Sequence, residues 1–525
     1  MSGAAAEGAG RPATGGLEWG ILFTDHYQLS MSQLYHQRGL ADRPARFEHF
    51  FRRYPDYGSH QAGYAIIAGH ETLLEWMATA RFGPAEREVL ASQYDDAGRR
   101  VFTDEFCDWL LEHGHFDGVS IRAVPEGRVV HAGAPLMIIE GPLVQAQLLE
   151  TALLNIVNFQ TLIATKASRV AEASRGRPVL EFGLRRSAGW GGNAATRAAL
   201  IGGAGASSNV GMSYRMGLHA RGTHAHSMVQ AFMALGDGGS AGELDAFRAY
   251  AETYPDDCLL LVDTVNTLES GVPNAIRVFD ELRATGHEPV GIRLDSGDLA
   301  YLAIQSALLL DEAGYDETRI VLSSSLDELL IFQIISQIDQ EAPRYGIDPR
   351  GLIDRLVMGV GSKLSASEGH PYLDGVYKLV ALSSEGSWVP AIKISETPAK
   401  TPNPGDKDVT RVYDRRGRST ADLLSIAGES LPADLELHHP IEPGVRRHLG
   451  AAEVSATESL LEPLVVDGRP VDHDADLAVL RARRDADVER LDPGVRRLVN
   501  PHRYHVSLTP ELWGLKQELI ARTRA

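Results

Sequence analysis

The amino-acid sequence predicts an α/β protein whose central element is a set of parallel strands joined by helices. Four short apolar runs, which end at Asp263, Asp295, Ser323 and Gly359, are each followed by a polar or glycine-rich turn and then by a helical pattern. The ends of these runs are about 28 to 36 residues apart, which is the length of one strand–helix unit. Repeated units of this kind favour parallel strands with helical crossovers. An irregular or complete (β/α) barrel is the simplest arrangement, and an open doubly wound sheet is the alternative.

The segments before this series are predicted in chain order. Residues 69–80 have a helical pattern, and residues 119–141 read as extended segments broken by turns. Residues 143–173 form an apolar stretch with helical periodicity and without Pro or Gly, which predicts one or two buried helices. Residues 179–182 and 217–220 are predicted to be two earlier strands of the parallel set.

The segments after the series differ in composition. Residues 392–411 are rich in Pro, Lys and Gly and are predicted to form a loop or hairpin. Residues 421–525 are predicted to form a mostly helical appendix with a charged, solvated surface. At the other end, residues 1–16 are Gly/Ala-rich and are expected to be a flexible tail.

The composition is that of an ordinary globular protein, because 44% of the 525 residues are hydrophobic and 23% are charged. A net charge of −19 argues against nucleic acid as a partner, since phosphate neutralisation needs a basic face. A small anion could still bind to a local group of arginines and backbone N–H groups. The two cysteines lie in no CxxC pair, which favours a reducing cytoplasm over a disulfide or zinc scaffold. No apolar run approaches the ~18 residues of a membrane span, so no membrane partner is expected.

Two histidines, His224 and His226, form the first candidate site. If this segment is a strand, residues two apart point to the same face. The pair could then bind a metal ion in a barrel hydrolase, or one imidazole could act as a nucleophile. The alternative is an ordinary histidine with a satisfied hydrogen bond.

Polar turns at the predicted strand ends form the other candidates. Residues 293–299 (RLDSGDL) could cap a helix, or their carboxylates could accept ribose hydroxyls or hold Mg²⁺ through water. Residues 323–325 (SSS) and 359–363 (GVGSK) could bind phosphate through free N–H groups, ordinary tight turns being the alternative. Arg185 and Arg186 could clamp a pyrophosphate or a carboxylate.

Taken together, these motifs resemble those of the nicotinate phosphoribosyltransferase family. The resemblance rests on residues 24–28 (TDHYQ), 47–52 (FEHFFR), 183–186 (GLRR), 222–227 (GTHAHS), 270–276 (SGVPNAI), 291–299 (GIRLDSGDL) and 375–380 (GVYKLV). It implies a type II phosphoribosyltransferase fold, which is an irregular α/β barrel plus an α/β sandwich. The expected parts are a tail at 1–16, a sandwich part at 17–142, the barrel at 143–380, a return to the sandwich at 381–420, and the appendix at 421–525.

The resemblance also implies a reaction. Nicotinate and phosphoribosyl pyrophosphate would give nicotinate mononucleotide and pyrophosphate, with ATP hydrolysis coupled through a phosphohistidine and with Mg²⁺ accompanying the pyrophosphate. The expected assembly is a cytoplasmic homodimer with active sites at the interface.

Carried over residue by residue, His226 matches the phosphorylated histidine, whereas His224 occupies a variable position. The positions that match substrate-binding residues or their neighbours are Tyr27, Thr223, Arg293, Ser362, Arg185, Asp295 and Gly361. Ser208 falls where the related nicotinamide-using enzyme has an Asp that contacts the amide, which favours the acid as substrate.

Two stretches depart from the family pattern. Residues 202–210 (GGAGASSNV) lack a Phe–Asp pair, and residues 263–267 (DTVNT) lack a Tyr and an Asp. A non-catalytic relative that binds phosphoribosyl compounds is therefore the second hypothesis, and the metal-dependent barrel hydrolase is the third.

Overall fold

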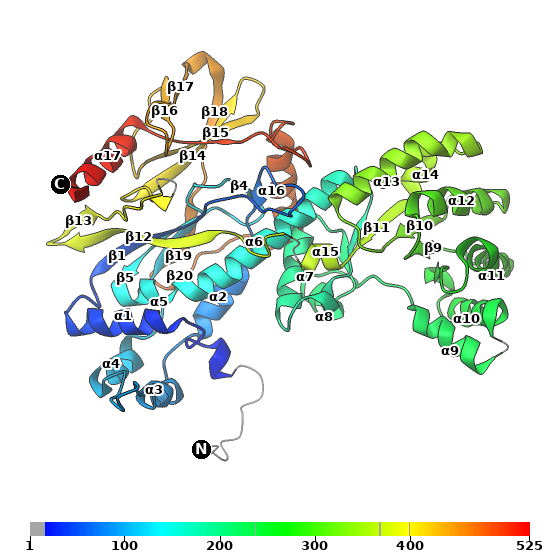
Figure 1. The fold of residues 1–525 in the computed structure, drawn as a ribbon, viewed down its shortest axis with the longest axis horizontal. Coiled ribbons are helices and arrows are strands. Elements are labelled where there is room, and N and C mark those ends of the chain that lie inside the picture. The colour runs from blue at the N-terminus through cyan, green and yellow to red at the C-terminus, as the bar shows by residue number, and fades with distance from the viewer. Residues whose placement is uncertain (1–15, 237, 367–368, 398–399, 525) are drawn as a thin grey trace.

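The computed structural model describes residues 16–236, 238–366, 369–397 and 400–524. Figure 1 shows two lobes, one built around a parallel sheet and the other containing both the first and the last described elements. The predicted tail lies outside the described residues, apart from Gly16.

The first lobe contains a six-stranded parallel sheet in the order β7-β6-β11-β10-β9-β8. Its strands are β6 Val179–Glu181, β7 Ala206–Ser207, β8 Leu259–Leu261, β9 Gly291–Leu294, β10 Arg319–Leu322 and β11 Leu356–Val360. The four strands of the predicted series and the one predicted at 179–182 are confirmed. The strand predicted at 217–220 is wrong, because these residues form a turn and coil, and the edge position is taken by β7. Within the described residues no ladder joins β8 to β7, so the curled sheet is an irregular, open barrel.

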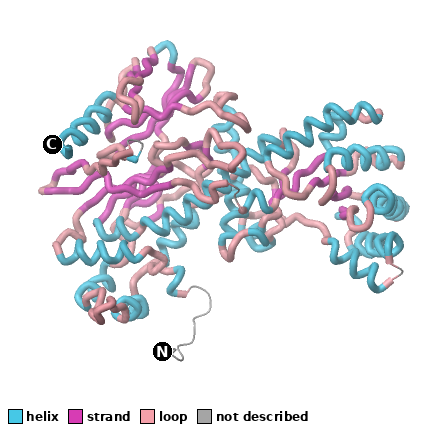
Figure 2. Tube along the Cα trace, in the orientation of Figure 1, coloured by secondary structure: helices cyan, strands magenta, loops and turns pink. Residues whose placement is uncertain are grey.

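Helices connect these strands and cover the sheet, as Figure 2 shows. They are α7 Gly191–Ile201, α8 Val210–Arg215, α9 His226–Leu235, α10 Gly239–Thr253, α11 Val272–Ala284, α12 Leu299–Glu312, α13 Glu328–Glu341, α14 Pro349–Arg355 and α15 Ser362–Ser365. Three of them begin at an aspartate whose carboxylate accepts a first-turn N–H, namely Asp298, Asp327 and Asp348. This capping explains why strand ends and helix starts could be located from the sequence.

The second lobe contains one antiparallel sheet and one mixed sheet with one parallel strand pair, and distant segments contribute to both. The first has the order β13-β12-β1-β5-β3-β19-β20, and the second has the order β17-β16-β21-β15-β14-β18. The strands of the first sheet are β1 Pro44–Phe51, β3 Ser120–Ala123, β5 Met137–Pro142, β12 Gly375–Ser384, β13 Ser387–Pro390, β19 Glu462–Val466 and β20 Arg469–Pro470. Those of the second are β14 Lys407–Asp414, β15 Ser419–Ile426, β16 Leu435–His438, β17 Arg446–Leu449, β18 Val454–Ser459 and β21 His505–Leu508. β2 Ala65–Ile66 pairs with β4 Val129–Val130.

The prediction of a mostly helical appendix at 421–525 is wrong. This segment contributes strands β16 to β21 and most of β15, and its α-helices are α16 Leu477–Arg490 and α17 Pro510–Arg524. The strands were hidden by charged residues that are in fact buried in pairs. On β14 and β15, for example, Arg411 Nε donates to Asp422 Oδ1 at 2.8 Å and both side chains are only 1% exposed.

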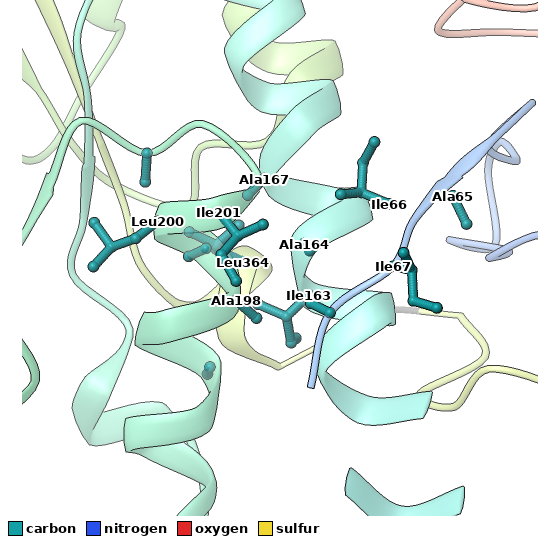
Figure 3. Packing of buried hydrophobic residues seen from close by; sticks show 14 of the residues in the cluster. Ala65, Ile66, Ile67, Ile163, Ala164, Ala167, Ala198, Leu200, Ile201 and Leu364 are labelled. Carbon is teal, nitrogen blue, oxygen red and sulfur yellow. The ribbon is translucent and has the colours of Figure 1, made fainter. Parts of the chain in front are cut away.

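Helices α5 Leu143–Leu148 and α6 Glu150–Ala173 link the two lobes, as predicted for residues 143–173. The most apolar window of this stretch is long enough to cross a membrane, but 67% of it is buried inside the fold, as in a core helix. Figure 3 shows Ala164 and Ala167 of α6 facing Ala198 and Ile201 of α7. The helices approach so closely that a Cβ at Gly202 would lie 2.3 Å from the backbone oxygen of Ala164. The remaining helices lie in the second lobe and are α1 His26–Gln37, α2 His70–Thr79, α3 Pro84–Ala91 and α4 Asp104–His113.

Candidate active site

The carboxyl ends of the parallel strands gather most of the predicted site residues at one edge of the sheet. Because all six strands run in the same direction, the turns that follow them meet at this edge. In spatial order, the residues after the strands are Ser208 (β7), Arg185 (β6), Gly361 and Ser362 (β11), Ser323 (β10), Asp295 (β9) and Asp263 (β8). A shared edge is the arrangement from which α/β enzymes build their active sites.

Arg293, Ser323 and Asp295 form a hydrogen-bonded network at the centre of this edge. Arg293 Nε donates to Ser323 Oγ at 2.9 Å, and Arg293 Nη2 lies 3.2 Å from Asp295 Oδ1. The Ser323 hydroxyl donates to the same carboxylate oxygen at 2.6 Å. The guanidinium carbon lies 5.4 Å from the centre of the Phe182 ring. This network fixes a positive group beside an aromatic face, which suits a planar anionic ring.

His226 is the first residue of helix α9, so the prediction that it lies on a strand is wrong. The Gly- and Thr-containing segment before it runs as coil, because β7 takes the edge position that residues 217–220 were predicted to fill. The imidazole nevertheless reaches the sheet edge. Its Nδ1 lies 3.0 Å from the Thr264 hydroxyl, and its Nε2 lies 3.8 Å from both Asp263 Oδ1 and Asp295 Oδ2. With 38% of its side chain exposed, the ring is also open to solvent and therefore to a substrate.

Asp263 and Thr264 are site residues that the sequence analysis did not identify. Asp263 is almost completely buried, and its Oδ2 accepts the Asp295 N–H at 3.1 Å and the Ser296 hydroxyl at 2.5 Å. Its Oδ1 is buried without a hydrogen-bond partner. The available signal was their place two and three residues after the end of β8, the neighbour of β9 in the sheet.

His224 does not share the site of His226. Its Nε2 accepts the backbone N–H of Leu261 at 3.0 Å, and its ring packs beside Tyr250. An accepting Nε2 places the proton on Nδ1, so neither nitrogen is free to bind a metal ion. Burial lowers the pKa of His224 to about 4, which keeps it neutral. The metal-ligand interpretation of the pair is therefore wrong, and His224 is a structural residue that secures β8.

The loops after β11 and β10 bring the backbone close to the site. A Cβ at Gly359 would lie 2.7 Å from the Phe182 ring, so only glycine fits there. Gly361 precedes Ser362, which begins α15. Ser324 and Ser325 have φ values of +101° and +49°, which are strained for non-glycine residues and are typical of functional turns.

Three further predicted residues lie around this edge. The Ser208 N–H donates to the Glu181 carbonyl at 3.0 Å, which fixes the turn after β7. Arg185 is exposed on the short helix Leu184–Arg186 that follows β6. Thr223 lies three residues before His226, where its hydroxyl donates to the His224 carbonyl at 3.2 Å. Contacts of these residues with a substrate stay predictions.

Tyr27 is not brought to the sheet edge within one chain. It lies at the start of α1, which is at the opposite side of the molecule from α9 in Figure 1. The tyrosine lines a separate cavity of about 370 Å³ together with Glu150, Phe159 and Tyr372. Burial and the charges of Glu150 and Asp25 raise the pKa of its hydroxyl, so the group remains protonated.

Residues 263–267 depart from the family pattern, but the side chain at position 266 still caps the turn that follows. The Asn266 side chain accepts the backbone N–H groups of Leu268 at 3.1 Å and Glu269 at 2.9 Å. Asn is as good a capping residue as Asp. The loop that carries Asp263 and Thr264 is therefore ordered without the acidic residue.

Comparison with known proteins agrees with this arrangement. The profile of the nicotinate phosphoribosyltransferase (NAPRTase) N-terminal domain matches residues 22–158, and that of the C-terminal domain matches residues 406–516. The nicotinate phosphoribosyltransferase of Bacillus subtilis is 36% identical over 96% of this chain and 96% of its own length. The chain belongs to the nicotinate phosphoribosyltransferase family. The human member is 31% identical, over 95% of this chain and 96% of its own length.

Solved structures share the fold of this chain. The crystal structure of human nicotinic acid phosphoribosyltransferase superimposes with a TM-score of 0.77 at 29% identity, over 94% of this chain and 99% of that one. A nicotinate-nucleotide pyrophosphorylase from Pyrococcus furiosus has the same fold, with a TM-score of 0.64 at 19% identity, over 92% and 99% of the two chains. The type II phosphoribosyltransferase fold expected from the resemblance is therefore confirmed.

Proposed function

We propose that this chain is a nicotinate phosphoribosyltransferase that forms nicotinate mononucleotide and pyrophosphate from nicotinate and phosphoribosyl pyrophosphate. Family membership supports the assignment, and one observation on the site carries it. The imidazole of His226 is partly open to solvent beside Asp263 and Asp295, and Asp295 in turn pairs with Arg293 at the same strand edge.

The chemistry needs positioning and charge stabilisation more than covalent help. Displacement at the anomeric carbon of ribose develops positive charge on the sugar and negative charge on the departing pyrophosphate. The N–H groups after β11 and the Arg185 side chain would bind phosphate oxygens. Arg293 would pair with the carboxylate of nicotinate, with the face of Phe182 beside it.

ATP coupling through His226 is part of the proposal. A neutral imidazole can attack the γ-phosphorus, so that the N–P bond forms as the bond to the β-phosphate oxygen breaks and ADP leaves. The phosphorylated ring would carry negative charge next to the substrate loops and could order them through nearby Arg or Lys side chains.

Mg²⁺ would enter with the pyrophosphate group. Among the described residues no cluster of three or more His, Cys, Asp or Glu side chains forms a ready metal site. The donor chemistry nevertheless fits, because Asp263 Oδ1 is buried without a hydrogen-bond partner and carboxylate oxygens are the ligands that Mg²⁺ prefers. Asp263 and Asp295 would therefore help to hold a magnesium ion that is bound mainly by substrate and water, and the ion would neutralise phosphate charge.

A cytoplasmic homodimer is the proposed assembly. Its support is the separation of Tyr27 from His226 in one chain, because a second copy could bring its tyrosine to the open sheet edge. Light scattering should then give about twice 57.0 kDa. Mixing Tyr27→Ala and His226→Ala proteins should restore about a quarter of the wild-type activity, since half of the randomly formed dimers would carry one intact site. No recovery after verified subunit exchange would refute a shared site.

The reaction is tested by assaying nicotinate, nicotinamide and quinolinate, each with and without ATP. We expect nicotinate mononucleotide to form and ATP to stimulate its formation. His226→Ala should abolish the stimulation, whereas the matched variant His287→Ala should not. His287 is half-buried on the loop before β9, at the amino-terminal end of that strand, and pairs with Asp256 at 2.7 Å. Binding of phosphoribosyl pyrophosphate without turnover of any pyridine would instead support the non-catalytic relative.

A further inference from the structure

Glu181 is a buried carboxylate at the carboxyl end of β6, the strand that lies between β7 and β11 in the parallel sheet. The residue is only 1% exposed. Among the described residues no lysine or arginine forms an ion pair with it, whereas the buried Asp422 and Asp487 both pair with Arg411. Burial of a carboxylate away from cations costs stability unless hydrogen bonds compensate it. The groups that donate to Glu181 are therefore the key to what it does.

These donors come from three different segments. Oε1 accepts the backbone N–H of Gly183, the residue that precedes the short helix carrying Arg185. Oε2 accepts the Ser207 hydroxyl at 2.5 Å and the Thr196 hydroxyl at 3.0 Å. Ser207 is the last residue of β7, and Thr196 lies on α7. One side chain thus ties together the loop after β6, the end of β7 and the helix between them.

The same network reaches the loop after β11. The Gly183 carbonyl accepts the Ser365 hydroxyl at 3.0 Å, and Ser365 ends α15, the helix that Ser362 begins. A Cβ at Gly183 would lie 2.6 Å from the Cβ of Ser365, so only glycine lets the two segments approach this closely. Because Glu181 fixes the N–H of the same glycine, it also sets the place of α15.

On its other side the network orders the turn after β7. The Asn209 N–H donates to the Ser207 hydroxyl oxygen at 2.9 Å, and the Asn209 side-chain amide donates to the Thr196 hydroxyl oxygen at 3.2 Å. Each hydroxyl accepts a hydrogen bond from Asn209 and donates one to Glu181. Ser208 lies inside this turn, so its position at the sheet edge follows from the same set of bonds.

The direction of these bonds requires an acceptor on both oxygens of residue 181. A carboxylate presents acceptors only, whereas an amide of the same shape presents one acceptor and one NH₂ donor. In one orientation of a glutamine the NH₂ group would face the Gly183 N–H, and in the other it would face the two hydroxyls. Either orientation loses at least one hydrogen bond, so Glu181→Gln disturbs the network without changing the volume of the side chain.

We propose that Glu181 is a positioning residue for substrate binding, whose carboxylate holds the loops after β6, β7 and β11 in one mutual arrangement. These loops carry Arg185, Ser208 and Ser362, which are expected to meet the substrates. The carboxylate lies buried behind the loops and acts through them. The inference rests on the proposed function for its effect on substrate binding, but the order of the loops can be measured without any activity.

The first experiment is steady-state kinetics combined with thermal unfolding. Weaker anchoring of the loops in Glu181→Gln should raise the KM for phosphoribosyl pyrophosphate by about tenfold and change kcat less. Asp487→Asn is the matched control, because Asp487 is also a buried carboxylate but accepts the Val129 N–H at 2.9 Å and pairs with Arg128 in the second lobe. It should lower the unfolding midpoint and leave the KM unchanged. An unchanged KM in Glu181→Gln, or an equal rise in Asp487→Asn, would overturn the proposal.

A double-mutant cycle tests whether Glu181 acts through its hydroxyl partners. Ser207→Ala removes one donor and should raise the same KM by about threefold. The double variant should have a KM close to that of Glu181→Gln alone, because both changes break the same network. Effects that multiply in the double variant would contradict the proposal. If Glu181→Gln does not fold, Ser207→Ala still decides, since an unchanged KM there would refute the network.

The second experiment is hydrogen–deuterium exchange of the full-length protein without substrate. In Glu181→Gln we expect faster exchange in peptides that cover residues 183–187 and 207–210, and unchanged exchange at β9 and β10. Equal exchange in the variant and the wild type, or a loss of protection spread over the whole sheet, would overturn the proposal. If the wild type turns over no pyridine, the proposed function fails, whereas the exchange pattern still decides whether Glu181 orders these loops.

Discussion

A buried charge cluster around Glu328 connects the two lobes, and its loss should strongly destabilise the protein. Glu328 begins α13 and is fully buried. Its carboxylate lies 2.7 Å from His60 Nε2, 2.5 Å from Lys166 Nζ and 3.0 Å from Arg169 Nε. Since Lys166 and Arg169 belong to α6 and His60 lies between β1 and β2, one carboxylate joins three separate segments.

The proposed change is Glu328→Gln, which keeps the shape of the side chain and removes its charge. Lys166 and Arg169 are 5% and 1% exposed, so both would lose their buried counter-ion. Breaking a buried ion pair in this way costs about 3–5 kcal/mol. At about 2 °C per kcal/mol for a large domain, the midpoint of thermal unfolding should fall by about 6–10 °C.

The pH dependence of this effect has a definite sign. Burial alone would raise the pKa of Glu328, but the hydrogen bond from His60 and the charges of Lys166 and Arg169 hold it well below the usual value of 4.5. A carboxylate with a lowered pKa contributes stability above its unfolded pKa and loses that contribution as the pH falls. The difference between the wild type and Glu328→Gln should therefore be full at neutral pH and should shrink below about pH 4.5.

The assay is thermal unfolding followed by circular dichroism and calorimetry. Asp339→Asn is the matched control, since it makes the same kind of change on the same helix. Asp339 is 46% exposed and pairs with Arg175 at 3.4 Å, so this pair is worth at most about 0.5–1 kcal/mol. Equal midpoints for the two variants would refute the reasoning that the Glu328 cluster stabilises the junction of the lobes.

Three further predictions follow from the site and the core. Arg293→Lys should raise the KM for nicotinate by about tenfold or more, because a lysine cannot donate to Ser323 and pair with a carboxylate through one planar fork. Steady-state kinetics with Arg293→Lys and Arg293→Met test this prediction. An unchanged KM for nicotinate in both variants contradicts it. Gly359→Ala should lower both activity and stability, because its Cβ would lie 2.7 Å from the Phe182 ring. A melting curve and a turnover assay measure the two effects. Values within error of the wild type in both would contradict the prediction. Stability should fall as the pH drops from 6.5 toward 4, by up to about 1.4 kcal/mol per pH unit for each buried neutral histidine, because the unfolded chain then binds protons that the folded chain does not. The histidines whose pKa burial lowers to about 4 are His49, His70 and His224, and denaturant titrations at pH 7 and pH 5 measure the effect.

The sequence predicted the parallel strands well because their signal is local. Each run of buried residues stops at a polar turn, and the next helix starts at a capping aspartate such as Asp298 or Asp327. The position of Asp295 at a strand end followed from the same signal. The strands of the last hundred residues could not be found in this way, because buried pairs such as Arg411 with Asp422 give a strand the composition of a solvated surface.

The errors around His226 have a different cause. Whether a short segment becomes a strand or a coil leading into a helix depends on which partner strand is available. Here β7 takes the edge of the sheet, so residues 217–220 do not pair and His226 begins a helix instead. The alternation that placed His224 and His226 on one face therefore did not apply, and the two rings serve different purposes.

The separation of these two histidines explains how a solvent-open site can still be well ordered. His224 is neutral, buried and bonded to the backbone of β8, so it fixes the strand from which Asp263 and Thr264 follow. Those two residues then contact the exposed ring of His226 from both of its nitrogens. Because the ordering groups are on the strand side and the open face is on the solvent side, the imidazole can be held in one orientation without being closed off from a substrate. If this reasoning is correct, a change at His224 should disorder His226 as well. His224→Leu, which cannot accept the Leu261 N–H, should alter the His226 NMR shifts without touching its ring, and unaltered shifts would show that the two histidines are independent.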